Sequence, residues 1–280
     1  MKKLFAIVLS LVMALSLVTA CAKKEEEPAD ELEAIKKAGV IKFAVSPDFA
    51  PYEFENLNAK DEDGKIVGCE IELAKYVADY IGVDLQIEPM DFASCQAAVS
   101  QGTVDFSMSG YAITEERKQT YNLSDPYKWS DDSRGQLVIV KKGDAEKYQT
   151  AEDFEGKTIT AQNGSLQMNL VNEQLEGVKV EPIGSLNDGI LSLMNGKIDC
   201  LACAGDTADN FVENYPDDIE IAVWHFDYTS SGNAALVKKG NDKLTAIINE
   251  AIKKASDEGL LKKWREEALV LAEELGVDNN

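Results

Sequence analysis

The chain has 280 residues and is strongly acidic, because 50 Asp and Glu residues outweigh 28 Lys and Arg residues and give a formal net charge of −22 at pH 7. This charge disfavours nucleic acids and other acidic polymers as partners, since binding them requires a basic face. A hydrophobic content of 45% over this length is sufficient for two modest cores.

The first twenty residues predict a secretory signal peptide. Lys2 and Lys3 give a basic start, and the run 4–20 that follows is uncharged and almost wholly apolar. This run is at the short limit for a membrane span and suits the apolar core of a signal peptide. We therefore expect residues 1–20 to be removed on export.

The apolar run ends in small residues directly before Cys21, which resembles a bacterial lipobox. This resemblance predicts lipidation of Cys21 and an extracytoplasmic protein anchored to the bacterial cell membrane. Ordinary cleavage after Ala20, with Cys21 incidental, is the alternative. Residues 21–31, the cysteine and a polar segment without apolar periodicity, are expected to form a flexible tether.

From residue 32 onward, segments with helical spacing of apolar residues alternate with segments of strand-like alternation. A strand, a loop, a helix and a further strand in this order imply a parallel or mixed sheet with right-handed crossovers. The expected helices cover 32–38, 70–81 and 93–101, and the expected strands cover 41–45, 83–87 and 104–107.

A polar stretch at 130–135 predicts a first crossing into a second lobe, and residues 229–233 predict a return crossing. The second lobe repeats the same order, with strands at 137–140, 157–161, 198–203 and one beginning at 178, and with one helix that ends at 175 and another at 186–194. After the return come a strand at 234–237 and helices at 244–256 and 260–274. We expect an α/β protein with lobe 1 at residues 32–131 and 230–280 and lobe 2 at residues 132–229. Each lobe would hold a mixed, mostly parallel sheet flanked by helices, and the ligand would lie between the lobes.

Four cysteines lie in the expected folded part, at Cys69, Cys95, Cys200 and Cys203. The last two form a C-x-x-C pair on an expected strand, where residues i and i+3 point to opposite faces and are badly placed to share a metal. His225 is the only histidine of the chain. We therefore expect structural thiols, no metal, no cofactor and no serine–histidine catalysis.

Residues 105–117 (DFSMSGYAITEER) are the strongest candidate for ligand recognition. Only three arginines occur in the chain, and Arg117 is one of them. An arginine retained among many lysines suggests a planar, two-pronged contact with a carboxylate or phosphate. The strand before it runs into a small-residue loop at Ser109 and Gly110, at the kind of strand end where open α/β sheets bind ligands. A surface ion pair is the alternative for Arg117, and the neighbouring motifs disfavour it.

Several segments together resemble one family, the extracytoplasmic solute-binding proteins of amino-acid ABC importers (bacterial solute-binding protein family 3). The segments are FAPYEF (49–54), VGCEIELAKYVADYIGV (67–83), GTVDFSMSGYAITEER (102–117), SDPY (124–127), ALVKKGNDKL (235–244) and EGLLKKW (258–264). The resemblance implies the two-lobed periplasmic-binding-protein fold of type II, with two crossing segments. It also implies a free amino acid as ligand, an ABC permease and its ATPase as partners, and a monomer.

The resemblance also implies which residues contact the ligand. Phe49 and Phe92 stand where the family places aromatic walls, and Arg117 matches its carboxylate-binding arginine. Gly164 and Ser165 precede an expected helix, whose unpaired N–H groups favour a carboxylate. The full implied set is Phe49, Phe92, Ser109, Gly110, Tyr111, Ala112, Arg117, Gly164, Ser165 and Asp206.

The sequence departs from the family pattern at two of these places. Ala112 stands where Ser or Thr is usual, which removes one hydroxyl contact. The amine-binding aspartate of the family falls at Ala204, and Asp206 is expected to replace it, because in a continuing strand the two residues would point to the same face. The alternative is a ligand without a primary amine at this place.

The expected ligand is neutral, and an aromatic amino acid fits the pattern. Ser46 stands where members that bind basic side chains tend to carry Asp, and Phe49 and Phe92 offer two rings. Tyr111 and Trp129 are expected beside the ligand, with packing in the core or at the rim as the alternative.

The runner-up function is an enzyme, because cyclohexadienyl (prephenate or arogenate) dehydratases also resemble this fold. Such an enzyme needs a positioned acid or base, for which Glu53, Asp91 and Asp206 are the candidates. Loop capping explains Glu53 and Asp91 better, and no paired carboxylates are evident, so we predict a binding protein. A detached sensor domain is a third, less favoured hypothesis.

Overall fold

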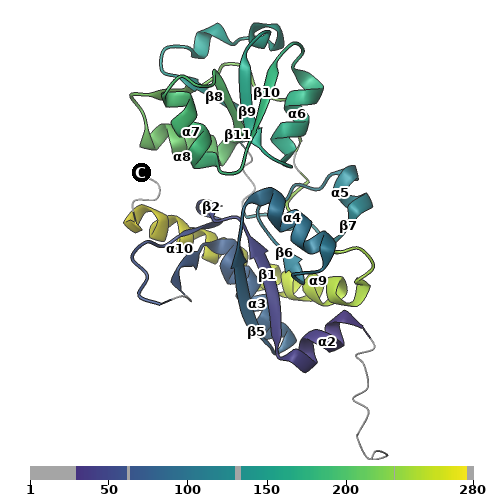
Figure 1. Ribbon diagram of the computed structural model, residues 1–280. Helices are drawn as coiled ribbons and strands as arrows, with labels where there is room; N and C mark the ends of the chain where they lie inside the picture. Colours follow the sequence, from purple (N-terminus) through teal and green to yellow (C-terminus); the bar gives the residue numbers. More distant parts are fainter. Residues whose placement is uncertain (1–29, 62–63, 130–133, 230, 276–280) are drawn as a thin grey trace, which may run out of the picture.

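The computed structural model describes residues 30–61, 64–129, 134–229 and 231–275. Figure 1 shows two lobes, each built on a five-stranded sheet. The predicted signal peptide, the lipidation at Cys21 and most of the predicted tether lie outside the described residues. Within the described part, no helix is long and apolar enough to cross a membrane.

Lobe 1 is built on a sheet with the strand order β5-β1-β6-β13-β7. β1 pairs in parallel with β5 and β6, whereas β13 is antiparallel to β6 and β7. The sheet is therefore mixed, as expected from the sequence. Its strands are β1 (Val40–Val45), β5 (Asp84–Pro89), β6 (Phe106–Ser107), β7 (Tyr121–Leu123) and β13 (Leu236–Lys238).

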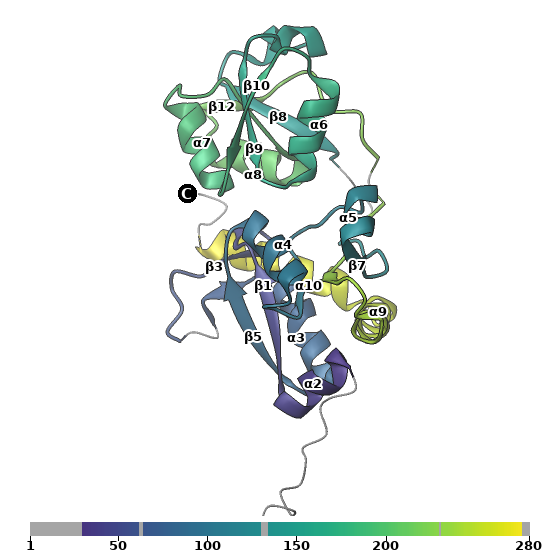
Figure 2. The same cartoon turned by 45° about the vertical axis from the view of Figure 1, so that its right-hand side comes forward.

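Helices cover both faces of this sheet (Figure 2). Side chains of β1 on one face, such as Ile41 and Phe43, pack in one cluster with apolar residues of α3, α9 and α10. Ala44, on the other face, packs with α4. The helices of lobe 1 are α2 (Glu31–Ala38), α3 (Cys69–Ile81), α4 (Phe92–Gln101), α5 (Glu115–Thr120), α9 (Asp242–Asp257) and α10 (Leu260–Leu275).

Lobe 2 repeats the arrangement with the strand order β10-β9-β11-β8-β12. β9 is parallel to β10 and β11, and β8 is antiparallel to β11 and β12. In both sheets three parallel strands are thus followed by a fourth that runs in the opposite direction and by a fifth that is antiparallel to the fourth. The strands of lobe 2 are β8 (Gln136–Lys141), β9 (Thr158–Gln162), β10 (Lys179–Ile183), β11 (Cys200–Ala204) and β12 (Ile219–Ile221).

The two faces of the lobe 2 sheet carry separate cores. Cys200 packs in the cluster that includes residues of α6, and Cys203 packs in the cluster of α7 and α8. The expectation that this pair points to opposite faces is therefore confirmed, and all four described cysteines are free and buried. The helices are α6 (Leu166–Gln174), α7 (Leu186–Met194) and α8 (Gly205–Asn214), with the 3-10 turns η3 (Ala145–Lys147) and η4 (Ala151–Phe154).

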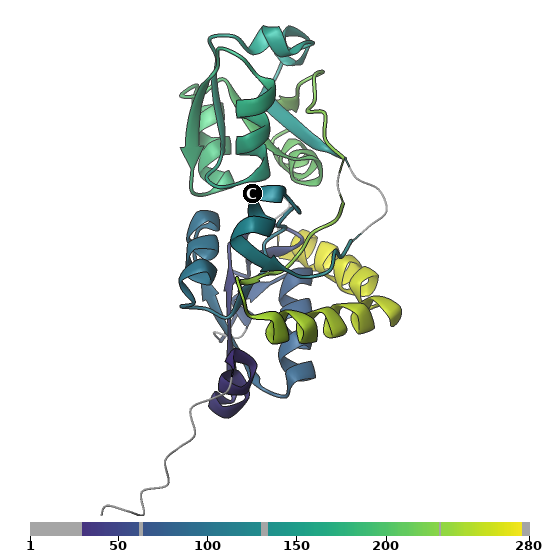
Figure 3. The same ribbon diagram turned by 90° about the vertical axis from the view of Figure 1, so that its right-hand side faces the viewer.

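Figure 3 shows the side of the molecule on which the two connecting segments join lobe 1. On the lobe 1 side they are paired, because Tyr127 and Asn233 exchange both backbone N–H···O bonds at 2.9 Å. A third, small antiparallel sheet of β2 (Asp48–Phe49), β3 (Glu53–Glu55) and β4 (Ile66–Val67) lies at the lobe 1 edge of the cleft. It places residues 48–53 opposite lobe 2.

One local expectation is wrong. The strand expected at 198–203 ends at Ala204, and helix α8 begins at Gly205, so Asp206 lies in a first helical turn and not in a continuing strand. The short helix α5 was also not expected. Thr114 caps it by accepting a hydrogen bond from the backbone N–H of Arg117 at 3.2 Å.

Candidate ligand-binding site

A cavity of about 170 Å³ lies between the two lobes. It forms where β1 and β6 of lobe 1 and β9 and β11 of lobe 2 end, which is where sheets of this kind bind ligands. Its lining includes Asp48, Phe49, Tyr52, Glu53, Phe92, Ser109, Gly110, Ala112, Arg117, Lys128, Trp129, Arg134, Ser165 and Asp206.

Arg117 reaches the cavity from helix α5 and is only 6% exposed. Its guanidinium donates to the carbonyl oxygens of Ala112 at 2.8 Å and Gly164 at 3.1 Å. It also lies 5.8 Å from the ring centre of Phe92 and 5.2 Å from that of Tyr111, a cation–π arrangement. Burial lowers the pKa of Arg117. Among the described residues no carboxylate pairs with it, so a buried cation faces the cavity without its anion.

Glu70, at the start of α3, holds the loop that carries Gly110. Its carboxylate is fully buried and accepts bonds from the Gly110 N–H at 3.0 Å, the Tyr127 hydroxyl at 2.8 Å and the Trp129 Nε1–H at 3.4 Å. Burial raises the pKa of Glu70, and these donors act in the opposite direction. The Gly110 N–H, expected to meet the ligand, is therefore already used inside the protein.

Glu53 is a second fully buried carboxyl group, and it lines the cavity. Neither of its oxygens has a hydrogen-bond partner among the described residues. Burial, followed by the nearby charges of Glu70 and Asp48, raises the pKa of Glu53 well above its ordinary value. Burial thus disfavours the ionised form of Glu53 in the cavity lining.

Aromatic rings form part of the lobe 1 wall. Phe49 stacks on Tyr52 with ring centres 4.8 Å apart, and both line the cavity together with Phe92 and Trp129. Gly110 leaves room for Phe49, because a Cβ atom there would lie 2.8 Å from the ring. Tyr111 differs from expectation: it is fully buried and lies behind Phe92 at 5.0 Å, outside the cavity lining.

Lobe 2 presents the start of helix α6 to the cavity. Ser165 is its N-cap, accepts a bond from the backbone N–H of Met168 at 3.1 Å and lines the cavity. Gly164 does not line the cavity, and its carbonyl accepts bonds from Arg117 and from Gln96 at 3.2 Å, both in lobe 1. Anions are stabilised at such a helix start by unpaired N–H groups and the helix dipole.

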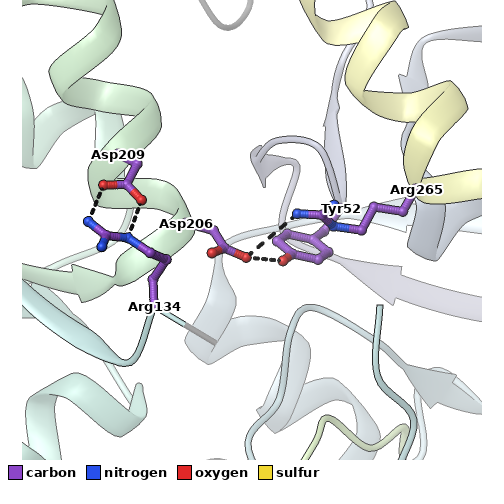
Figure 4. A network of polar contacts seen from close by, with 5 residues as sticks. All are labelled: Tyr52, Arg134, Asp206, Asp209 and Arg265. Carbon is purple, nitrogen blue, oxygen red and sulfur yellow. Dashed lines mark hydrogen bonds and ion pairs between the residues drawn. The ribbon is translucent and has the colours of Figure 1, made fainter. Parts of the chain in front are cut away.

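Asp206 also faces the cavity, from the first turn of α8 (Figure 4). Its Oδ2 accepts a bond from the Tyr52 hydroxyl of lobe 1 at 2.8 Å and lies 4.0 Å from Nη2 of Arg265 in α10. Burial and the charge of Asp206 raise the pKa of Tyr52 well above its ordinary value, so the phenol stays protonated and donates. Asp206 therefore reaches the cleft by a helix start, although the strand argument for it was wrong.

Arg134 lines the lobe 2 side of the cavity and, unlike Arg117, is paired with a carboxylate. Its guanidinium makes a two-pronged pair with Asp209, at 2.5 and 2.7 Å, and its side chain is 55% exposed (Figure 4). Gly205 permits this approach, because a Cβ atom there would lie 2.8 Å or less from the backbone of Arg134. All three arginines of the chain, Arg117, Arg134 and Arg265, thus gather at the cleft.

Eight of the ten predicted site residues line one cavity, and the exceptions are Tyr111 and Gly164. Sequence reasoning missed Tyr52 and Arg134. The aromatic spacing of Phe49 and Tyr52 around Pro51 was a usable signal for the first, whereas the scarcity of arginine was a signal for the second. Within the described residues, no group of three or more His, Cys, Asp and Glu side chains is arranged to hold a metal ion.

Known proteins resemble this chain over most of its length. Residues 41–269 match the profile of a family described as bacterial extracellular solute-binding proteins, family 3. The L-cystine-binding protein TcyJ of Escherichia coli is 27% identical over 257 residues, which are 90% of this chain and 92% of that protein. The ABC transporter glutamine-binding protein GlnH of Bacillus subtilis is 28% identical over 290 residues, or 95% and 98% of the two chains.

Solved structures agree with these relatives. An amino acid ABC transporter substrate-binding protein, AbpA of Streptococcus pneumoniae bound to L-arginine, superposes with a TM-score of 0.77 at 33% identity. The match covers 84% of this chain and 97% of that one. The fold expected from the sequence, the periplasmic-binding-protein fold of type II, is confirmed.

These relatives are named as amino-acid-binding proteins, two of them of ABC transporters, and the family is described as extracellular solute-binding proteins, which disfavours the dehydratase alternative. The chain therefore belongs to family 3 of the bacterial extracellular solute-binding proteins, and it is an amino-acid-binding component of an ABC transporter.

Proposed function

We propose that the protein is a lipid-anchored receptor that closes its lobes on an amino acid with an uncharged side chain, neutral or aromatic, and presents it to a membrane permease. The observation that carries this proposal is the charge arrangement of the cavity. Arg117 is a buried cation without a carboxylate partner among the described residues, and Asp206, bonded to Tyr52 and 4.0 Å from Arg265, presents a carboxylate from the opposite lobe. Together they match the carboxylate and the ammonium group of a zwitterion.

The other charged groups of the cavity lining are already accommodated. Arg134 is paired with Asp209, Lys128 is exposed to solvent, and burial raises the pKa of Glu53 and so disfavours its ionised form. Asp48 accepts hydrogen bonds from lobe 2. These groups are thus paired, solvated or hydrogen-bonded to the protein, and the rings of the lobe 1 wall suit an apolar or aromatic ligand side chain.

The test is a calorimetric and thermal-shift screen of the purified protein against the common amino acids. A ligand at a hundred times its dissociation constant should add about 2.7 kcal/mol of stability, which is readily visible as a rise in Tm. We expect neutral or aromatic amino acids to give the largest rise. If arginine or lysine binds most tightly, the proposal of a ligand with an uncharged side chain is wrong. The affinities of the single variants Asp48→Asn and Glu53→Gln would then show which acid contacts the cationic side chain.

For the lipid anchor, we expect Cys21→Ala to release the protein from membranes or to leave its precursor unprocessed. Two acyl chains hold a protein stably at a membrane where one is marginal, as expected for a diacylated cysteine. Fractionation followed by mass spectrometry measures both outcomes. A substituted protein that stays with membranes at its mature mass would contradict the anchor.

We also propose the division into lobe 1 (32–131 and 230–280) and lobe 2 (132–229), and a monomeric receptor. The paired segments around Tyr127 and Asn233 support a crossing at these boundaries. Analytical ultracentrifugation with and without ligand should give one species of monomer mass. A ligand-dependent dimer would contradict the monomer.

A further inference from the structure

The N-terminus of helix α7 in lobe 2 is capped from the other lobe. A helix start has four N–H groups without partners inside the helix, and a side chain at the N-cap position normally receives one of them. Ser185 occupies that position, but its side chain makes no such bond. Instead, the N–H of Leu186 donates to Oδ2 of Asp48, in lobe 1, at 3.0 Å.

The same carboxylate makes two further contacts. Nε2 of Gln162, at the end of β9 in lobe 2, donates to Oδ2 of Asp48 at 3.0 Å and to the carbonyl of Gly184 at 3.1 Å. On the lobe 1 side, the hydroxyl of Ser46 donates to Oδ1 at 3.0 Å. One carboxylate of lobe 1 therefore holds both the end of β9 and the start of α7.

Asp48 lies between two spaces. On one side is the ligand cavity, and on the other is an open groove lined by Ser185, Asp188 and other residues of the cleft mouth. Both of its oxygens are occupied by protein donors. Asp48 thus joins the two lobes at a point shared by the cavity and the groove, through bonds that use no ligand atom.

We propose that Asp48 is an inter-lobe helix cap, a positioning residue that stabilises the closed lobes and thereby raises the affinity for every ligand of the cavity. The capping bond needs α7 and β2 to be adjacent, so separating the lobes breaks it. A negative charge at a helix start gains from the dipole as well as from the hydrogen bond. The closed population, and with it the apparent affinity, then depends on Asp48.

The part of the proposal that concerns ligands rests on the proposed function. Because the cap stabilises the closed lobes and not a particular ligand, Asp48→Ala should lower the affinity for all ligands by the same factor, roughly five- to thirtyfold. The weakening should appear mainly as faster dissociation. A residue that touched the ligand would instead weaken ligands unequally, according to their side chains.

The first experiment measures amide hydrogen exchange at Leu186 by NMR, in the ligand-free protein and with L-glutamine, L-cystine or L-phenylalanine as probes. Asp48→Ala should accelerate exchange of this amide, whereas the matched control Ser185→Ala should not, because the Ser185 side chain makes no capping bond. Small-angle X-ray scattering of the ligand-free proteins should show more separated lobes for Asp48→Ala only.

The outcomes are separable. If none of the probes binds, the proposed function is in question. Amide exchange and scattering of the ligand-free protein still test whether Asp48 caps α7 from the other lobe. Unchanged exchange at Leu186 and unchanged scattering in Asp48→Ala would overturn the inter-lobe cap. Faster exchange in Ser185→Ala would show that α7 is capped within its own lobe and would equally overturn it.

Discussion

The two lobes share one strand arrangement, but they present different kinds of groups to the cleft. Lobe 1 offers buried groups held by hydrogen bonds: the loop at Gly110 is held by Glu70 within the lobe, and Arg117 donates to the carbonyl of Ala112 in its own lobe and to that of Gly164 in lobe 2. Lobe 2 offers helix starts, with Ser165 at the beginning of α6 and Asp206 in the first turn of α8. Lobe 1 thus supplies buried side chains to the recognition surface, whereas lobe 2 supplies the starts of two helices.

The two arginines that line the cavity differ in how far they are exposed to solvent. Arg117 is 6% exposed, whereas the side chain of Arg134, the corresponding cation on lobe 2, is 55% exposed and already paired. Removing a buried charge partner has a large effect, and removing a solvated pair has a small one. The comparison therefore predicts that affinity depends mainly on lobe 1.

The largest expected effect is that of Arg117→Ala. Truncating one partner of a buried charge pair costs about 2–5 kcal/mol, which is roughly thirtyfold to a few thousandfold in affinity. Arg117→Lys should also weaken binding, because an ammonium group cannot reproduce the two-pronged geometry. Titration calorimetry measures both.

The control for this prediction is Arg134→Ala. Its pair with Asp209 is largely exposed, so we expect a loss of about threefold or less. If Arg134→Ala weakens binding more than Arg117→Ala does, the assignment of affinity to lobe 1 is wrong.

The second prediction concerns the fixed loop of lobe 1. Glu70→Ala leaves the N–H of Gly110 and the donors of Tyr127 and Trp129 without their acceptor, so we expect a loss of about 3 kcal/mol in the free energy of unfolding. Urea denaturation measures it. Glu72→Ala, on the same helix but in a half-exposed pair with Lys75, should change stability by about 0.5 kcal/mol or less. Equal effects of the two variants would refute a special role of Glu70.

The third prediction sharpens the role of lobe 2. Asp206→Asn should weaken the binding of an amino acid by about tenfold, which corresponds to about 1.4 kcal/mol. The affinity for its 2-oxo acid analogue should not change, because that compound has no ammonium group. Asp209→Asn, on the same helix but outside the cavity lining, serves as the control. Equal losses for both compounds would indicate that Asp206 acts only through Tyr52 and Arg265, as a contact between the lobes.

The smallest expected effect is a pH dependence from Glu53. Its pKa is raised in the folded protein by burial, so the folded state retains the proton that the unfolded chain releases above about pH 4.3. Ionisation of the unfolded chain therefore lowers the stability of the protein as pH rises towards the folded pKa. Glu53→Gln removes this ionisation, so it should raise the free energy of unfolding by about 1 kcal/mol at pH 7. Near pH 4, where the unfolded chain keeps the proton, it should leave the free energy of unfolding unchanged.

Chemical denaturation at the two pH values measures this difference. Glu55→Gln, an exposed position on the same strand, is the control and should show no such pH dependence. A destabilised Glu53→Gln at pH 7 would mean that Glu53 is ionised in the fold, with a partner in the cleft.

The sequence by itself determined the elements and most of the site. Helical and strand periodicity predicted α7 at the bounds that the structure has, and the segment 105–117 marked Arg117. These predictions succeed because the periodicity of apolar residues follows local burial. An arginine among many lysines likewise indicates a two-pronged contact that lysine cannot make.

Only the tertiary structure decided how groups far apart in the sequence are used. Strand periodicity could not show that α8 begins at Gly205, because a helix start depends on the fold around it. The Gly110 N–H is bound by a carboxylate 40 residues away, and Asp48 caps a helix 138 residues away. Such contacts connect separate elements and separate lobes, so they arise from the packing of the whole chain and have no counterpart in local pattern.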